Sequence, residues 1–269
     1  CEDLGGGTLD DASGQDRSGH VEGMVAYHLP GPECQAISEQ NSNNALQLAG
    51  GRISVTVPKA RTLSFWFWNG MSNTVRDHTG DLVQHGVSRF LRIGGKADGE
   101  SSGSLILQDG GKRFFGKTKL ALKAWHHVVM SQEEEEVKIY LDGHIIPEVS
   151  APLNPSESEQ WHLGGELPVE GRLDEVAWFK SAFSQKEAAR NFSASRMTPP
   201  ARPALPRPKY DRGAMAGYQK AVLASQPSVW LDQGNEASKR RVQKKIEGIG
   251  DVYTVEFWVR NQLPNQIRP

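Results

Sequence analysis

The sequence has few of the features that mark several large classes of protein. Its 269 residues include two cysteines, Cys1 and Cys34, which either form one disulfide in an oxidising compartment or stay unpaired. No apolar run approaches the length that crosses a bilayer, so membrane insertion is not expected. Neither a His-Glu-x-x-His nor a Cys-x-x-Cys spacing is present, so neither zinc motif is indicated.

The chain also lacks a large net charge. The formal value is −1, which argues against a nucleic-acid-binding protein as a whole. The charge is uneven, with −7 over residues 1–200 and +6 over residues 201–269, and this change of sign supports a boundary near residue 200. The basic cluster KRRVQKK (239–245) has no interleaved aromatic residues, so we interpret it as a solvated loop and expect no nucleic-acid partner.

An aromatic-rich segment occurs twice. TLSFWFWNGMSNTVR (62–76) and TVEFWVRNQLPNQIR (254–268) align without gaps and share six identical residues, including the Phe-Trp pair of each copy. The spacing of 192 residues is too long for a solenoid unit and suits a whole module. We therefore expect residues 213–269 to be the beginning of a second, similar module that is incomplete, and the chain to be an excerpt of a longer protein.

Short segments rich in β-branched and aromatic residues recur from residue 45 to residue 180, separated by Gly, Asp and Asn. Their length and alternation predict strands, and their number predicts an all-β fold, an antiparallel two-sheet sandwich. The predicted strands are 45–50, 52–57, 62–68, 81–86, 89–94, 104–108, 113–120, 125–131, 137–141, 159–165 and 172–179.

Turn and helix signals agree with this pattern. Asp109-Gly110 and Asp142-Gly143 are hairpin signals, because these residue pairs tolerate the positive φ angles of tight turns. Ser184 followed by Glu187 is a capping box, and the residues behind it favour one short helix.

A proline-rich stretch follows this helix. Five prolines between residues 199 and 208 exclude a helix or a central strand and predict an extended linker. The expected organisation is a sandwich domain at 1–195, a linker at 196–212 and the incomplete second module at 213–269.

Taken in order, these segments resemble a known family, the laminin-G-like, concanavalin A-like jelly rolls of large multi-domain bacterial surface and exported proteins. The resemblance implies a jelly-roll sandwich and an extracytoplasmic location. YQKAVLASQPSVWLDQ (218–233) looks like the start of a further module of this kind. The segments that carry the resemblance are LDDASGQDRSG (9–19), NALQLAGGRISVTVP (44–58), LSFWFWNG (63–70), WHHVVMS (125–131), VKIYLDG (137–143) and GRLDEVAWFKSAFSQKE (171–187).

Some jelly rolls are glycoside hydrolases, which need two carboxylates that face each other about 5–9 Å apart. Asp174 and Glu175 are neighbours on a predicted strand, so their side chains point to opposite faces. The acidic run 133–136 lies where a surface turn belongs. His126 and His127 are likewise neighbours and cannot chelate one ion together, so a structural role is favoured. The chain is not expected to be an enzyme.

Calcium is the one cofactor that the resemblance implies. Members of the family often hold a structural calcium where the opening loop meets an Asp of the closing strand, and this role carries over to Asp11, Asp16 and Asp174. Such ions take several oxygen ligands. The alternative is a set of Asx turns without a metal.

The favoured function is a non-catalytic module that binds a glycan or a cell-surface protein through loops at one end of the sandwich, alongside other domains of the parent protein. Trp68 and Trp161 are candidate ligand-binding residues, because aromatic rings stack on sugars, although either could belong to the core. A structural spacer or adhesion module without glycan binding is the alternative, and a jelly-roll glycoside hydrolase is the third hypothesis.

Overall fold

The computed structural model describes residues 7–33 and 43–196. Within these ranges no helix has the length and apolar character to cross a membrane. Both cysteines, the linker predicted beyond Arg196, and the second module predicted at 213–269 with its basic cluster lie outside the described residues.

One of the two sheets has eight antiparallel strands. Its middle strands are predicted from the sequence, whereas the first two are not. In spatial order they are β1 (Thr8–Leu9), β2 (Gly19–Glu22), β5 (Arg52–Thr56), β14 (Gln160–Leu163), β7 (His78–His85), β8 (Arg89–Gly94), β9 (Leu105–Asp109) and β10 (Lys112–Phe115).

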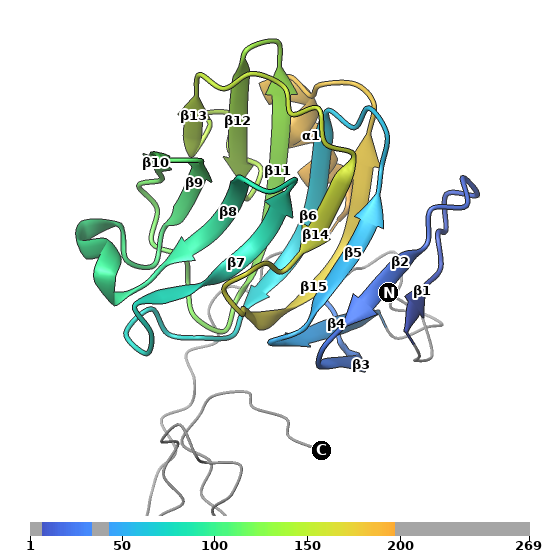
Figure 1. The fold of residues 1–269 in the computed structure, drawn as a ribbon, viewed down its shortest axis with the longest axis horizontal. Helices are drawn as coiled ribbons and strands as arrows, with labels where there is room; N and C mark the ends of the chain where they lie inside the picture. Colours follow the sequence, from blue (N-terminus) through green and yellow to red (C-terminus); the bar gives the residue numbers. More distant parts are fainter. Residues whose placement is uncertain (1–6, 34–42, 197–269) are drawn as a thin grey trace, which may run out of the picture. The chain divides into compact units, whose positions relative to one another are not determined.

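The other sheet has seven antiparallel strands and lies face to face with the first (Figure 1). In spatial order they are β13 (Val149–Ala151), β12 (Glu136–Leu141), β11 (Trp125–Glu133), β6 (Thr62–Asn69), β15 (Glu170–Phe179), β4 (Asn44–Ala49) and β3 (Val25–Pro30). Non-consecutive neighbours such as β6 beside β11 and β15 are typical of a jelly roll, so the predicted fold class is confirmed.

The predicted strand at 113–120 is too long. β10 ends at Phe115, and Gly116 approaches the carboxylate of Glu148 so closely that an added Cβ would lie 2.7 Å from it. The strands β1, β2, β3 and β13 are absent from the prediction. β1, β2 and β13 have four residues or fewer, and β1, β3 and β13 are sheet edges.

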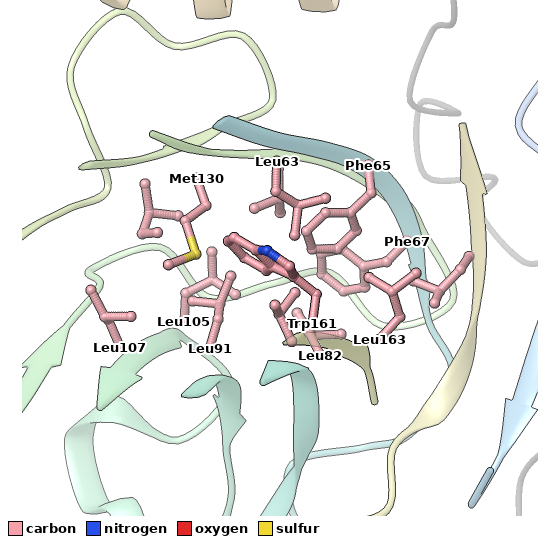
Figure 2. Close-up of a cluster of buried hydrophobic side chains, with 14 of the residues drawn as sticks. Leu63, Phe65, Phe67, Leu82, Leu91, Leu105, Leu107, Met130, Trp161 and Leu163 are labelled. Atoms are coloured by element: carbon pink, nitrogen blue, oxygen red, sulfur yellow. The ribbon is translucent and has the colours of Figure 1, made fainter. Parts of the chain in front are cut away.

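The core fills the space between the sheets. Phe65 and Phe67 of β6 point inward and are at most 1% exposed, while Trp66 between them points to the outer side. Figure 2 shows these phenylalanines facing Leu82 and Leu163 of the other sheet, with Trp161 between the two layers. Strand alternation therefore separates the inner core from an outer aromatic cluster on the seven-stranded sheet.

The helix α1 (Gln185–Ala194) covers this outer cluster. Its capping box is confirmed: Ser184 N donates to Glu187 Oε2 at 2.8 Å, and Ser184 Oγ accepts from Glu187 N. Phe192 stacks on Trp66 with ring centroids 5.6 Å apart. A short 3-10 helix, η1 (Lys96–Ser101), links β8 and β9.

Candidate functional site

A pocket of about 410 Å³ lies at one end of the sandwich. Residues 59–61 between β5 and β6, the ends of β7 and β11, and the loop before β14 meet there. We call it the end pocket, and its volume is in the range typical of small-ligand sites. It is lined by Lys59, Ala60, Arg61, His85, Arg89, Met130, Gln132, Pro155, Ser156, Trp161 and Lys180.

Trp161 and His85 form the aromatic part of the wall. Their rings are stacked, with centroids 3.6 Å apart and an interplanar angle of 11°. Trp161 is 3% exposed, and its buried indole Nε1 has no hydrogen-bond partner among the described residues. This nitrogen is inaccessible to solvent, so it offers no direct contact to a ligand in this conformation.

His85 contributes an uncharged ring to the pocket wall and is not poised to act as a base. Its Nε2 donates to the carbonyl oxygen of Ser158 at 2.8 Å. Burial lowers the pKa of His85 to about 4, although the bond to Ser158 opposes the shift. At neutral pH the ring is therefore uncharged and serves to stack on Trp161.

Arg89 is a structural element of the pocket. Its guanidinium donates to Asp109 Oδ2 at 2.7 Å, to the carbonyl of Asn154 at 2.8 Å and to Gln132 Oε1 at 3.1 Å. Burial alone would raise the pKa of Asp109, but the bonds from Arg89 and Ser88 outweigh it and lower that pKa. The charge of Arg89 is thus neutralised within the fold.

Gln132 completes this rigid wall. Its Nε2 donates to the carbonyl of Leu153 at 2.9 Å and of Glu134 at 2.8 Å, which ties β11 to the loop before β14. The pocket therefore has a preformed lining held by hydrogen bonds from three separate segments.

The solvent-facing side of the eight-stranded sheet is a second polar surface. His162 Nδ1 lies 2.9 Å from Ser54 Oγ, which donates to Glu22 at 2.7 Å. Arg92 pairs with the buried Asp81 at 2.9 Å, and burial raises the pKa of Asp81 despite this pairing. His162, Ser54 and Glu22 form one group and Arg92 and Asp81 an ion pair, so they offer fewer contacts to a ligand than the end pocket does.

The three aspartates predicted to hold calcium do not form a cluster. Asp11 accepts hydrogen bonds from Ser13 N at 2.8 Å and Arg17 N at 3.0 Å within its own loop. Asp174 is fully buried on β15, where burial raises its pKa. Residues 7–33 and 43–196 contain no group of three or more His, Cys, Asp or Glu side chains that could hold a metal ion.

Thus Asp11, Asp16 and Asp174 as placed do not form a three-carboxylate cage. Asp16 is exposed and has a positive φ of 57°, as expected for a turn residue. A Cβ added to Gly31 would lie 2.5 Å from Asp174 Oδ2 and 2.7 Å from Asn43 Nδ2, so this carboxylate is closely surrounded by protein. Calcium binding stays a prediction.

The two candidate tryptophans lie apart. Trp161 lines the end pocket, whereas Trp68 lies on the outer side of the seven-stranded sheet, with the Arg172 guanidinium 4.6 Å from its ring centroid. His126 and His127 contact different groups: His126 Nδ1 is 2.8 Å from Asp142 Oδ2, and His127 contacts Trp66.

Sequence reasoning did not select the cations at the mouth of the pocket. Lys59, Arg61 and Lys180 are exposed, and no ion pair joins any of them to a described acid. Each lies in an ordinary surface connection, and only the pairing of β15 with β6 brings Lys180 near the other two. No local signal in the sequence marks them as a group.

The paired sheets and the end pocket define a jelly-roll β-sandwich module. A model of the concanavalin A-like lectin/glucanases superfamily matches residues 40–189. This is more than half of the chain, and the chain belongs to that superfamily, which confirms the resemblance seen in its motifs. No curated protein sequence matches the chain.

Solved structures are similar to the chain at low sequence identity. A mutant of Trypanosoma rangeli sialidase displaying trans-sialidase activity is 14% identical, with a TM-score of 0.52 over 73% of this chain and 32% of that chain. Domain 4 of AbnA, a GH43 extracellular arabinanase from Geobacillus stearothermophilus, in complex with arabinotriose, is 16% identical, with a TM-score of 0.49 over 68% of this chain and 91% of that chain. The sialidase match thus involves a third of that chain.

Proposed function

We propose that residues 1–195 are a non-catalytic carbohydrate-binding module of a larger exported protein, and that the end pocket holds the sugar. The observation that carries this proposal is the composition of the pocket wall, in which the stacked Trp161–His85 pair lies beside hydrogen-bonding groups. A sugar ring has apolar faces and a polar rim, so it needs both kinds of contact. The membership in a superfamily named for lectins and glucanases supports the same class of ligand.

The lining supports binding rather than hydrolysis. No Asp or Glu is among the described residues that line the end pocket. A glycoside hydrolase of the usual kind needs two carboxylates about 5–9 Å apart on either side of the bond to be cleaved. The nearest acid in the hydrogen-bond network of the wall, Asp109, is held by Arg89 and Ser88.

The first test blocks the pocket. Ser156 lines it, whereas the next residue, Glu157, is exposed and is not part of the lining. Purified protein would be screened on a glycan array, and the affinity for the best ligand measured by calorimetry. We expect Ser156→Tyr to weaken binding by about a hundredfold, because the ring occupies the ligand volume, and Glu157→Tyr to change it less than about twofold.

Two outcomes would count against the proposal. Unchanged affinity in Ser156→Tyr would move the sugar site elsewhere, with the polar face around His162 and Arg92 as the next candidate. An array with no glycan above background would instead support the spacer or adhesion module, whose partners are proteins. Thermal melting of both variants shows whether the fold is retained.

A further inference from the structure

The exposed cations at the end pocket are its most distinctive electrostatic feature. Lys59 and Arg61 extend from the connection between β5 and β6, and Lys180 directly follows β15. All three are exposed, and no described acid lies within ion-pair distance of them. Residues 1–200 together carry −7, so this positive mouth is opposite in sign to the domain around it.

The other arginines near the eight-stranded sheet do not contribute free charge. Arg89 is paired with Asp109 at 2.7 Å, and Arg92 with Asp81 at 2.9 Å. Because each guanidinium is already neutralised, neither adds appreciably to the field at the pocket. The charge available to a ligand is therefore that of the mouth.

The aromatic wall of the pocket adds no charge to that of the mouth. Trp161 is buried and uncharged, and the adjacent His85 ring is neutral. Low-dielectric walls beneath the three cations concentrate their electrostatic field and favour a ligand of opposite charge. A negatively charged oxygen is the group that the cations at the mouth would stabilise.

We propose that the end pocket selects saccharides that carry an anionic substituent, either a uronate carboxylate or a sulfate ester. This inference rests on the proposed sugar-binding function and adds the substrate class. The sugar ring contacts the aromatic wall, and its anionic group lies toward Lys59, Arg61 and Lys180. Neutral sugars of the same backbone lack the charge-assisted contacts and bind more weakly.

The test uses matched ligands. Oligogalacturonate is compared with its carboxyl-reduced neutral counterpart, and a sulfated glycosaminoglycan oligosaccharide with its desulfated form. Free sulfate ion is a further ligand in the comparison. It distinguishes a site that recognises an anionic sugar from one that binds any small anion. We expect at least one anionic member to bind about tenfold or more tightly than its neutral partner, and the difference to shrink as salt is raised.

Charge variants locate the contact. The double variant Lys59→Met, Lys180→Met should bind the anionic ligand about tenfold or more weakly than the wild type does. Its affinity for the neutral ligand should stay within about twofold of the wild-type value. Lys96→Met with Lys123→Met removes the same charge at the other end of the sandwich, where Lys96 N bonds to Arg76 O and Lys123 N to Asn69 O. This control should retain the wild-type affinity.

Each contrary result separates the two proposals. Equal affinity for the neutral and anionic partners, abolished by Ser156→Tyr, would overturn charge selection and leave sugar binding intact. Equal loss in both double variants would overturn it as well, because the attraction would then be non-specific. If free sulfate competed with the oligosaccharide and bound with the same affinity, the pocket would be a simple anion site, and selection of anionic saccharides would be overturned. No binding by any saccharide would overturn both proposals.

Discussion

His127 is buried at 2% exposure on the outer side of the seven-stranded sheet, beside Trp66 and Phe192, whose ring centroids lie 5.1 Å and 5.6 Å from its own. Its Nε2 is 3.1 Å from Asn191 Oδ1 and 3.0 Å from Ser64 Oγ. Burial lowers the pKa of His127 to about 4. A ring that could serve as a base in a solvent-exposed site thus acts here as a neutral bridge between β6, β11 and α1.

This shift predicts a dependence of stability on pH. The unfolded chain binds a proton at His127 near pH 6.5, whereas the folded chain does so only near pH 4. The free energy of unfolding should therefore fall as the pH is lowered from 6.5 to 4, by up to about 3 kcal/mol from this residue. Urea denaturation at several pH values measures it.

The variant His127→Gln isolates the contribution. Its free energy of unfolding at pH 7 should be lower because the ring contacts are lost. Between pH 6.5 and 4 this free energy should fall less steeply with pH than in the wild type, by the slope that uptake of up to one proton on unfolding produces. Retention of the full wild-type slope in this variant would show that His127 titrates normally. An NMR titration of the wild-type imidazole provides an independent reading.

For the candidate site, the sequence predicts individual residues and not their grouping. Trp161 follows from its residue type, and it lines the end pocket. Lys59 and Lys180 have no distinguishing neighbours in the sequence, and His85 resembles any strand histidine. The physical reason is that a pocket depends on which strand ends meet, and this is set by sheet pairing over more than 100 residues.

At the scale of elements, the turn after β12 supports α1. Asp142 and Gly143 have φ angles of +50° and +75°, as predicted for this pair. Asp142 Oδ1 accepts from His127 N at 2.7 Å, and a Cβ added to Gly143 would lie 2.7 Å from Phe192 Cγ. The turn is therefore packed directly against the helix.

Two glycine substitutions separate backbone strain from crowding. Gly143→Ala adds both a positive-φ penalty and a clash with Phe192, which is confined by Trp66 and His127. Gly110→Ala adds only the φ penalty, because nothing lies within 4 Å of its Cβ position. We expect Gly143→Ala to lower the free energy of unfolding by about 2–4 kcal/mol and Gly110→Ala to lower it by about 1 kcal/mol.

Chemical denaturation of both variants measures this difference. Equal losses would mean that Phe192 moves aside without cost, and that α1 is less firmly packed than its stacking on Trp66 indicates. Helix content by circular dichroism reports whether α1 is displaced in the Gly143→Ala protein.

At the scale of the molecule, the fifteen strands and α1 found among residues 7–33 and 43–196 extend from Thr8 to Ala194. The buried residues of the main core are contributed by both sheets within the same span. These residues suffice for two packed layers, which is the usual minimum for a stable domain. We predict that the domain boundary lies near residue 195.

A chain ending at Arg196 should fold without the remaining residues. We expect its thermal midpoint to lie within about 3 °C of that of the full chain, because a loss of about 1 kcal/mol shifts a domain of this size by about 2–4 °C. Differential scanning calorimetry measures it, and near-UV circular dichroism checks the packing of the tryptophans. A much larger decrease would place part of the stabilising core beyond residue 196.

Local patterns in the sequence determined the all-β class, most central strands, the Asp142-Gly143 turn and the capping box at Ser184. They could do so because strand alternation, positive φ angles and helix capping each depend on residues within a few positions. Tertiary structure alone decided that Trp161 stacks on His85 and that Lys59 and Lys180 line the same pocket. Residues distant in the sequence become neighbours only when the sheets pair and pack.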